Sequence, residues 1–423
     1  MKQNIILGAV GIILMFSFAG IVSPELKTGK QPSSNRQNGL MAEEVTAETK
    51  AKVDEQLIAA NNRFAFKLFE KITAKDEAEN VFISPMSIAI ALSMASNGAD
   101  GETMDKMLEA LELGTIPLEN IDSGYRQLLQ TLQTETEGIK IAIANSLWAN
   151  EEVKFKPEFI EDSQEFYEAK ATNLDFADIK SKDVINNWVK EQTNNKITEI
   201  VDSISPDNIL FLINAVYFKG EWTYKFNKEI TTEKPFYISE DESQQHPMMS
   251  RRGEYLYYET EQFQAIELPY GDKQASMYIF LPKEDSNLTE FTNSLTPENW
   301  QKWTQEMRSQ PGTIALPKFE LEYETELNSV LSALGMEIAF DRERADFSEM
   351  IEQSVHIDKV KHKTFLEVNE EGTEAAGVTS IGIRVTSMPT EKPFAMNVNR
   401  PFFCAIRDKE TNSILFMGNI RKP

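Results

Sequence analysis

The spacing of apolar residues predicts two helices in the first hundred positions of the chain. In the first, apolar side chains recur at the spacing of one helix face, at Val53, Leu57, Phe64, Leu68 and Ile72. A second helix is predicted over residues 86–96, because Ser84-Pro85 supplies an N-cap followed by a proline in the first turn. Nearly all residues of this second helix are apolar or small, so we expect it to be buried on every side.

Strand patterns follow in the second half. The run over residues 209–218 is continuously apolar apart chiefly from Asn214, which is typical of a strand covered on both faces, although a buried helix would show the same run. Shorter strand-like runs lie at 265–268, 276–281, 313–319, 363–368, 402–406 and 413–417. Helical patterns first and strands later favour an α+β fold with large mixed or antiparallel sheets. With no internal repeat and no linker after Lys50, one large domain over residues 51–423 is expected.

The segment from Glu370 to Thr386 has the most unusual pattern. One alternating set carries no charge and no large polar side chain: Thr373, Ala375, Gly377, Thr379, Ile381, Ile383 and Val385. The other set holds every charge from residue 373 onward: Glu374, Ala376, Val378, Ser380, Gly382, Arg384 and Thr386. Successive strand side chains point to opposite faces, so this is a strand with one face suited to burial. Its first half is small and poor in β-branched residues, so the segment suits an exposed loop in one state and a sheet strand in another.

Composition and charge narrow the classes of function. The 423 residues are 41% hydrophobic and 26% charged, which is ordinary for a soluble globular protein, and the net charge is −24. Such an excess of acid repels nucleic acid, and no basic run is longer than Arg251-Arg252, so no nucleic-acid partner is expected. The single cysteine, Cys404, excludes an intrachain disulfide and a cysteine-rich metal site. It lies in an apolar run and is interpreted as a small buried hydrophobe, with a reactive thiol as the alternative.

The N-terminus predicts export. Lys2 precedes an uncharged apolar run over residues 5–22, and small residues follow near its end. Residues 1–23 therefore resemble a signal peptide, or an uncleaved membrane anchor since the run approaches the length of a span. Residues 24–50 lack apolar periodicity and are interpreted as a disordered tether. A secreted, extracellular or periplasmic protein is expected, with anchoring through residues 5–22 as the alternative, and the simple leader fits a bacterial source.

Six short segments occur in the order found in one known family. They are Asn80-Val-Phe-Ile-Ser-Pro-Met-Ser-Ile88, Asn214-Ala-Val-Tyr-Phe-Lys-Gly-Glu-Trp222, Leu316-Pro-Lys-Phe319, Ala345-Asp-Phe-Ser348, Asn399-Arg-Pro-Phe-Phe403 and Leu415-Phe-Met-Gly418. Together they resemble the serpins, the serine protease inhibitors, over residues 55–423. The resemblance implies a single-domain α+β fold, with helices packed on three β-sheets and an exposed reactive-centre loop.

The resemblance also implies a mechanism and a partner. A target serine protease attacks the loop as a substrate, and the cleaved loop inserts into the main sheet while the acyl-enzyme is still intact. The trapped protease is distorted, so the ester is not hydrolysed. The expected protein is a monomeric, metastable inhibitor that needs no cofactor or metal and is not itself an enzyme.

Loop positions follow from the resemblance. The hinge matches Glu370, Glu371, Gly372, Thr373, Glu374, Ala375, Ala376, Gly377 and Val378. Because relatives place the hinge glutamate seventeen residues before the cleaved bond, counting from Glu370 puts that bond between Thr386 and Ser387. The alternative is Arg384–Val385. Threonine before the bond suits an elastase-like or other small-pocket protease, such as a subtilisin-like one, whereas Arg384 suits a trypsin-like protease.

A second group matches family positions that control the opening of the sheet. Ser84, Ser87, Asn214 and His362 match residues beneath its centre, and Trp222 matches a position where the loop first inserts. Glu370 matches a glutamate that relatives pair with a cation. From the residues alone, Ser84 is simply a helix cap and His362 a satisfied strand histidine.

Two rival functions remain. Only His246, His356 and His362 are available for a catalytic triad, and neither a Gly-x-Ser-x-Gly elbow nor a His-Glu-x-x-His pair occurs. His356 and His362 are six residues apart and form a poor metal signal. A non-inhibitory carrier or folding helper keeps the fold, but a charged or proline-rich hinge would favour it, and neither is present.

Overall fold

The computed structural model describes residues 54–76, 78–134, 137–373 and 392–423. The chain divides into two units, Met1–Lys50 and Ala51–Pro423. The predicted leader (1–23) and tether (24–50) lie outside the described residues. Among the helices that are described, none is long and apolar enough to cross a membrane.

The helices of the larger unit are concentrated in its first half, as expected. They are α1 Glu55–Lys75, α2 Pro85–Ser96, α3 Gly101–Ala110, α4 Leu118–Leu132, α5 Pro157–Tyr167, α6 Ser181–Gln192, η1 Lys228–Ile230, α7 Leu288–Asn293, α8 Pro297–Glu306, α9 Asn328–Leu331, η2 Ser332–Met336 and η3 Glu337–Phe340. The side chain of Asp54 caps α1 by accepting from the backbone N–H of Gln56 at 2.7 Å. Ser84 occupies the N-cap position of α2, yet its hydroxyl makes no capping bond.

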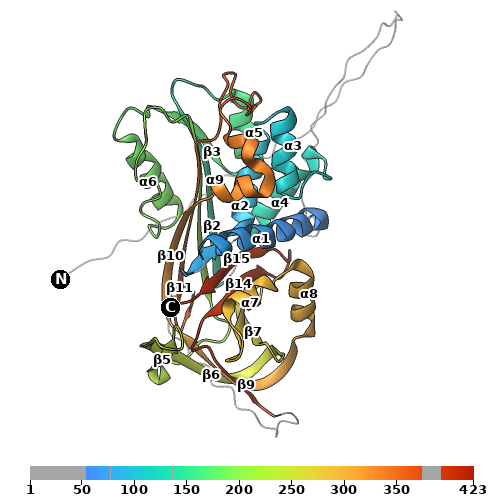
Figure 1. The fold of residues 1–423 in the computed structure, drawn as a ribbon, viewed down its shortest axis with the longest axis vertical. Helices are drawn as coiled ribbons and strands as arrows, with labels where there is room; N and C mark the ends of the chain where they lie inside the picture. The colour runs from blue at the N-terminus through green and yellow to red at the C-terminus, as the bar shows by residue number, and fades with distance from the viewer. Residues whose placement is uncertain (1–53, 77, 135–136, 374–391) are drawn as a thin grey trace, which may run out of the picture. The chain divides into compact units, whose positions relative to one another are not determined.

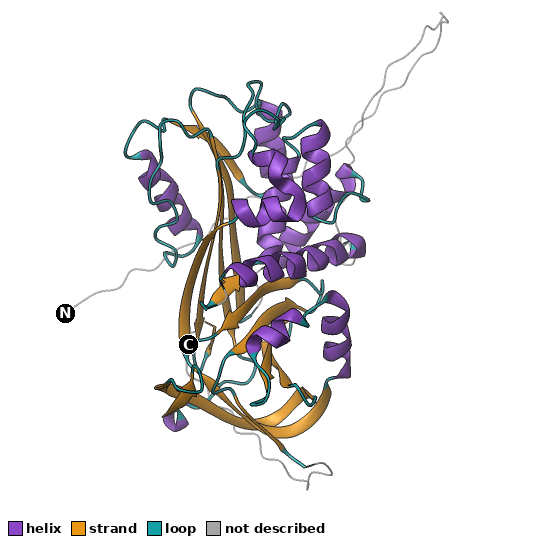
Figure 2. Cartoon of the chain, viewed as in Figure 1, coloured by secondary structure: helices purple, strands orange, loops and turns teal. Residues whose placement is uncertain are grey.

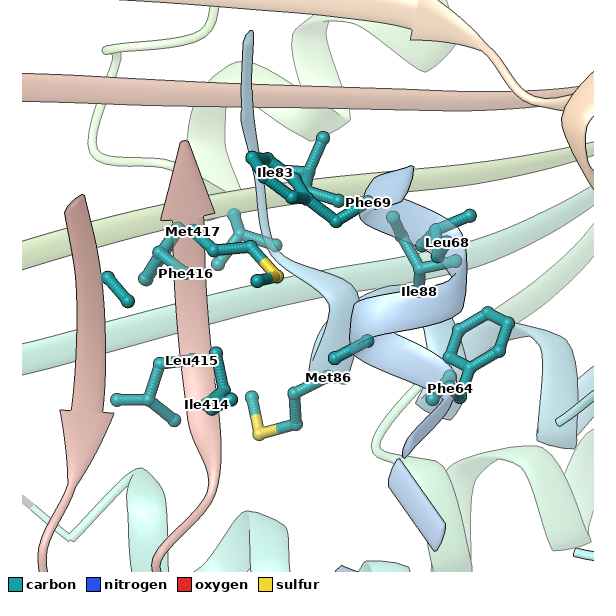
Figure 3. Packing of buried hydrophobic residues seen from close by; sticks show 14 of the residues in the cluster. Phe64, Leu68, Phe69, Ile83, Met86, Ile88, Ile414, Leu415, Phe416 and Met417 are labelled. Carbon is teal, nitrogen blue, oxygen red and sulfur yellow. The ribbon is translucent and has the colours of Figure 1, made fainter. Parts of the chain in front are cut away.

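The core is built around α2, which is buried on every side as predicted. Its twelve residues are all buried. Phe64 and Leu68 of α1 approach Met86 and Ile88 of α2, and the strand Ile414–Ile420 (β15) lies alongside (Figure 3). A helix without a polar face can only be covered by neighbours on all sides, and this fixes its place between α1 and the sheets.

One sheet has six strands in the order β10-β11-β12-β4-β2-β3. Their bounds are β10 Phe319–Glu326, β11 Lys359–Val368, β12 Gly372–Thr373, β4 Leu210–Glu221, β2 Ile139–Asn150 and β3 Lys170–Leu174. The predicted strand over 209–218 is β4, covered on both faces. α2 contacts one face of the sheet, and α6 lies against the other (Figures 1 and 2).

The other strands form one hydrogen-bonded sheet of nine, in the order β1-β15-β14-β8-β7-β6-β9-β13 with β5 also paired to β6. They are β1 Val81–Ile83, β5 Thr232–Tyr237, β6 Ser243–Glu259, β7 Phe263–Tyr270, β8 Ala275–Pro282, β9 Arg308–Pro317, β13 Phe394–Asn397, β14 Phe402–Asp408 and β15 Ile414–Ile420. Two of the three expected sheets are thus continuous, because the 17-residue β6 pairs with β5, β7 and β9. The single strand predicted over 313–319 is two strands, since the chain leaves one sheet at Pro317 and joins the other at Phe319.

Candidate functional site

The site lies along the seam between β4 and β11. These strands run parallel and pair directly from Phe211 with Lys359 to Tyr217 with Phe365. Beyond that point they part, and the two residues of β12 occupy the space between them. Thr373 pairs with Gly220 of β4 and with Val368 of β11. The seam is therefore closed along most of its length and wedged open at one end.

Gly372 fits this wedge because it has no side chain. Its φ is 156°, and a Cβ at this position would lie 2.0 Å from the carbonyl oxygen of Gly220. Any other residue would push β12 away from β4. The family resemblance assigned Gly372 to the hinge, and close backbone approach is the physical reason for a glycine there.

The side chain of Thr373 is fully buried beside an aromatic pair. Its Oγ1 lies 2.7 Å from the hydroxyl of Tyr270, whose ring stacks on Trp222 at 4.4 Å between ring centroids. Trp222 also donates its indole N–H to the carbonyl of Asn369 at 2.9 Å and its backbone N–H to that of Glu371 at 2.9 Å. Trp222 was expected near this point. Tyr270 was missed, and its position 103 residues from Thr373 leaves no local signal.

Two lysines hold the glutamates that precede β12. Lys318 lies 3.0 Å from the carboxylate of Glu370, which also accepts from the Thr231 hydroxyl at 2.8 Å. Burial alone would raise the pKa of Glu370, but the hydrogen bonds from Lys318 and Thr231 outweigh it, and the pKa lies below its ordinary value. Lys228 pairs in the same way with Glu371. The cation expected for Glu370 is thus Lys318, while the pair at Glu371 was not anticipated.

A buried polar network crosses the seam at its middle. His362 of β11 contacts the side-chain oxygen of Asn214 of β4 through Nδ1 at 2.5 Å, and the Ser87 hydroxyl lies 2.9 Å from the same oxygen. Ser84 donates its backbone N–H to Nε2 of His362 at 3.1 Å, and its hydroxyl donates to the carbonyl of Leu415 at 2.7 Å. The structure therefore brings together all four residues assigned to the centre of the sheet. The interpretation of Ser84 as a simple side-chain cap is wrong, because its hydroxyl bonds to β15 instead.

The network fixes the protonation of His362. Nε2 accepts a backbone N–H, so the ring proton is on Nδ1, from which it is donated to Asn214. The side chain is fully buried and has no carboxylate beside it. Desolvation therefore lowers its pKa from 6.5 to about 3, and the imidazole is neutral at physiological pH.

This burial predicts a dependence of stability on pH. The unfolded chain binds a proton on His362 below about pH 6.5 and the folded protein does so only near pH 3, so stability is lost as the pH falls through this range. Lowering the pH from 6.5 to 5 should cost roughly 2 kcal/mol from this group. His362→Gln should lack that part of the slope in urea unfolding measured at both pH values. Equal slopes in the two proteins would contradict the assignment.

A strap covers the other face of the seam. We define the strap as residues 193–209, which connect α6 to β4. The ammonium group of Lys363 donates to the carbonyl of Glu199 at 2.6 Å, and Lys361 lies 3.6 Å from the carboxylate of Asp202. Lys196 of the strap lies over the ring of Phe365 at 4.8 Å. A new strand between β4 and β11 would have to enter beneath the strap. Nothing in the sequence indicated that residues 193–209 cover the seam.

Several predicted positions lie outside the described residues. They are Glu374, Ala375, Ala376, Gly377, Val378, Arg384, Val385, Thr386 and Ser387. Cys404 is described and is a buried free thiol, whose pKa burial raises to about 12. Within the described ranges, no group of three or more His, Cys, Asp or Glu residues is arranged to hold a metal ion.

Comparisons with known proteins agree on one family. The family model described as Serpin (serine protease inhibitor) matches residues 59–423. The human leukocyte elastase inhibitor is 36% identical over 383 residues, which cover 87% of this chain and all of that protein. The native structure of tengpin, a thermophilic serpin, is 32% identical with a TM-score of 0.82, covering 89% of this chain and 96% of tengpin. Human thyroxine-binding globulin complexed with its ligand is 28% identical with a TM-score of 0.81, covering 87% of this chain and 99% of the globulin.

Proposed function

The chain belongs to the serpin family, and from that premise we propose that it is an irreversible suicide-substrate inhibitor of serine endopeptidases. Serpins are protease inhibitors rather than enzymes, so the catalytic chemistry comes from the partner protease. In the proposed reaction the protease cleaves the loop that follows β12 and forms an acyl-enzyme. The cleaved loop then inserts between β4 and β11 and carries the attached protease with it.

The observation that carries the proposal is the wedge made by β12. Gly372 and Thr373 already occupy the first positions of a strand between β4 and β11, antiparallel to both. If the loop continues in this register, each further loop residue pairs with the next residue toward the N-terminus of β4 and of β11. Thr379 would then lie opposite Asn214 and His362, so the central network must rearrange during insertion.

The free energy of insertion has identifiable sources. The loop residues that would share a face with Thr373 carry no charge. A charge buried on that face without a partner would cost several kcal/mol. Each new ladder hydrogen bond contributes about 0.5–1.5 kcal/mol, and burial of Ile381, Ile383 and Val385 adds roughly 1.5–3 kcal/mol each. The sum is on the order of 10 kcal/mol or more, enough to deform a bound protease locally.

The finer assignments are part of the proposal. We place the cleaved bond at Thr386–Ser387, with Arg384–Val385 as the alternative. The elastase named by the human relative is consistent with threonine before the bond, and subtilisin- and trypsin-like proteases remain candidates. We further propose that the protein is a monomer, exported by residues 1–23 or anchored through residues 5–22.

The rival proposal is that the protein is a carrier that binds a small molecule, as its structural relative thyroxine-binding globulin does. A carrier does not need a loop that can enter the sheet. The small uncharged residues at Thr373, Ala375 and Gly377, with no proline from 373 to 386, instead favour insertion.

Incubation with trypsin-, chymotrypsin-, elastase- and subtilisin-like proteases tests the proposal. We expect at least one of them to form an adduct that survives SDS, because the acyl ester is trapped before hydrolysis. Mass spectrometry of the released C-terminal fragment should show a first residue of Ser387, or of Val385 for the alternative bond. An active-site-blocked protease is the control and should form no adduct. Clean cleavage without an adduct by every protease would instead support the carrier.

A further inference from the structure

Asp358 ties β4 to β11 at the end of the seam farthest from β12. Its carboxylate accepts the backbone N–H of Ile209 at 2.5 Å and that of Leu210 at 2.9 Å, and the side-chain amide of Asn208 at 3.4 Å. The backbone N–H of Asp358 donates to the carbonyl of Leu210 at 3.0 Å. Hydrogen bonds from backbone N–H groups to a carboxylate are roughly twice as strong as neutral ones. This end of the seam is thus fastened more firmly than the ordinary ladder pairs next to it.

The same residue is held from the other side. Asn328, at the start of α9, donates its side-chain amide to the carbonyl of Asp358 at 2.7 Å and accepts the backbone N–H of Val360 at 2.9 Å. Asp358 therefore cannot follow β4 when β4 moves away from β11. We call Asp358 with the N–H groups of Ile209 and Leu210 the clasp.

The clasp is incompatible with a strand inserted beside it. Neighbouring strands lie about 4.7–4.9 Å apart, so one additional strand moves β4 and β11 apart by that distance. The contact from Asp358 to Ile209 would then exceed about 7 Å, far beyond a hydrogen bond. Continuing the register of β12 places Ile383 opposite Leu210 and Asp358, only a few residues before the proposed cleaved bond. The inserted strand would reach the clasp last.

We propose that Asp358 is a positioning residue that locks the base of the seam in the native state and is released in the final step of loop insertion. This inference rests on the proposed inhibitory function and deepens it, because it names a residue of this chain that separates the native form from the fully inserted form. The clasp stabilises only the native form, since its bonds do not exist once the strand has passed.

Thermal unfolding of native and loop-cleaved protein tests the clasp. Asp358→Asn removes the charge but keeps the shape, and we expect it to lower the native midpoint by roughly 2–4 °C while changing the cleaved midpoint by less than about 1 °C. Asp341→Asn is the matched control. Asp341 also accepts two backbone N–H groups, from Glu343 at 2.9 Å and Arg344 at 3.2 Å, but both donors belong to its own turn, so these bonds do not join β4 to β11. It should destabilise both forms alike.

The outcomes separate the clasp from the function on which it rests. If Asp358→Asn lowers both midpoints equally, or lowers neither, while the wild type gains stability on cleavage, the clasp is overturned and the inhibitory function stands. If the wild type gains no stability on cleavage, the inhibitory function fails and the clasp fails with it. Asp358→Ser, which keeps one smaller acceptor, provides the same comparison should the asparagine variant not accumulate as folded protein.

Discussion

Cleavage between residues 374 and 391 is expected to raise the midpoint of thermal unfolding by about 10 °C or more. Under the proposed function the cleaved loop adds a strand between β4 and β11, and the resulting hydrogen bonds and apolar burial would release on the order of 10 kcal/mol. A domain of this size gains roughly 1.3 °C for each kcal/mol. Calorimetry of the native protein and of protein cut in the loop by a protease that escapes trapping measures the change directly.

The control for this experiment is protein incubated with the same protease after its active site has been blocked. It should unfold at the native midpoint, since binding alone leaves the loop intact. A cleaved protein that unfolds at or below the native midpoint would show that the sheet does not accept the loop, and the proposed function would be wrong.

The parts of the fold that the sequence predicted are those with strong local signals. The apolar residues of α2 and the continuous run in β4 require cover on all sides wherever they lie, so their burial follows from the sequence alone. The alternation in residues 373–385 predicts a strand with one dry face, and beyond Thr373 this prediction lies outside the described residues. By contrast, the prediction of a single strand over 313–319 was wrong, because an apolar run does not reveal that the chain changes sheets at Lys318.

Contacts between distant residues account for what the sequence missed. Ser84 had the local pattern of a helix cap, but its hydroxyl bonds to Leu415, 331 residues away. Similarly, Tyr270 contacts Thr373 from a strand of the other sheet. Tyr270 lies in none of the six family segments, and Leu415, although it lies in one, gives no local sign that it pairs with Ser84. The resemblance predicted which residues matter, and the structure supplies the residues that they contact.

Polar contacts stabilise the seam at three places along its length. Lys318 holds Glu370 at the end where β12 enters, His362 and Asn214 cross the middle, and Asp358 ties the base. Each fastening is polar and local, whereas the free energy of insertion is spread along the whole new strand. Under the proposed function, these contacts and the direct pairing of β4 with β11 would keep the seam closed until cleavage frees the loop, and the seam would then open from the β12 end to the base.

Replacing Thr373 by arginine should nearly abolish inhibition. The side chain of Thr373 is fully buried against Tyr270 in the native protein, so the Thr373→Arg cation, which has no carboxylate partner there, should be displaced from this position before cleavage. It would have to be buried there again when the loop inserts. Burial of an unpaired charge costs several kcal/mol, and each 1.4 kcal/mol added to the insertion barrier slows insertion tenfold. Hydrolysis of the acyl-enzyme would then be faster than insertion of the loop. The stoichiometry of inhibition should rise at least tenfold, with the protease recovered active.

Thr373→Val is the matched control at the same position. Valine keeps the size and the β-branched shape and removes only the hydroxyl that contacts Tyr270. It should lower stability by about 1–3 kcal/mol through the unpaired Tyr270 hydroxyl but leave the stoichiometry of inhibition within about twofold of the wild type. If the arginine variant trapped the protease as efficiently as the valine variant, insertion would not begin at Thr373, and the register extended from β12 would have to be abandoned.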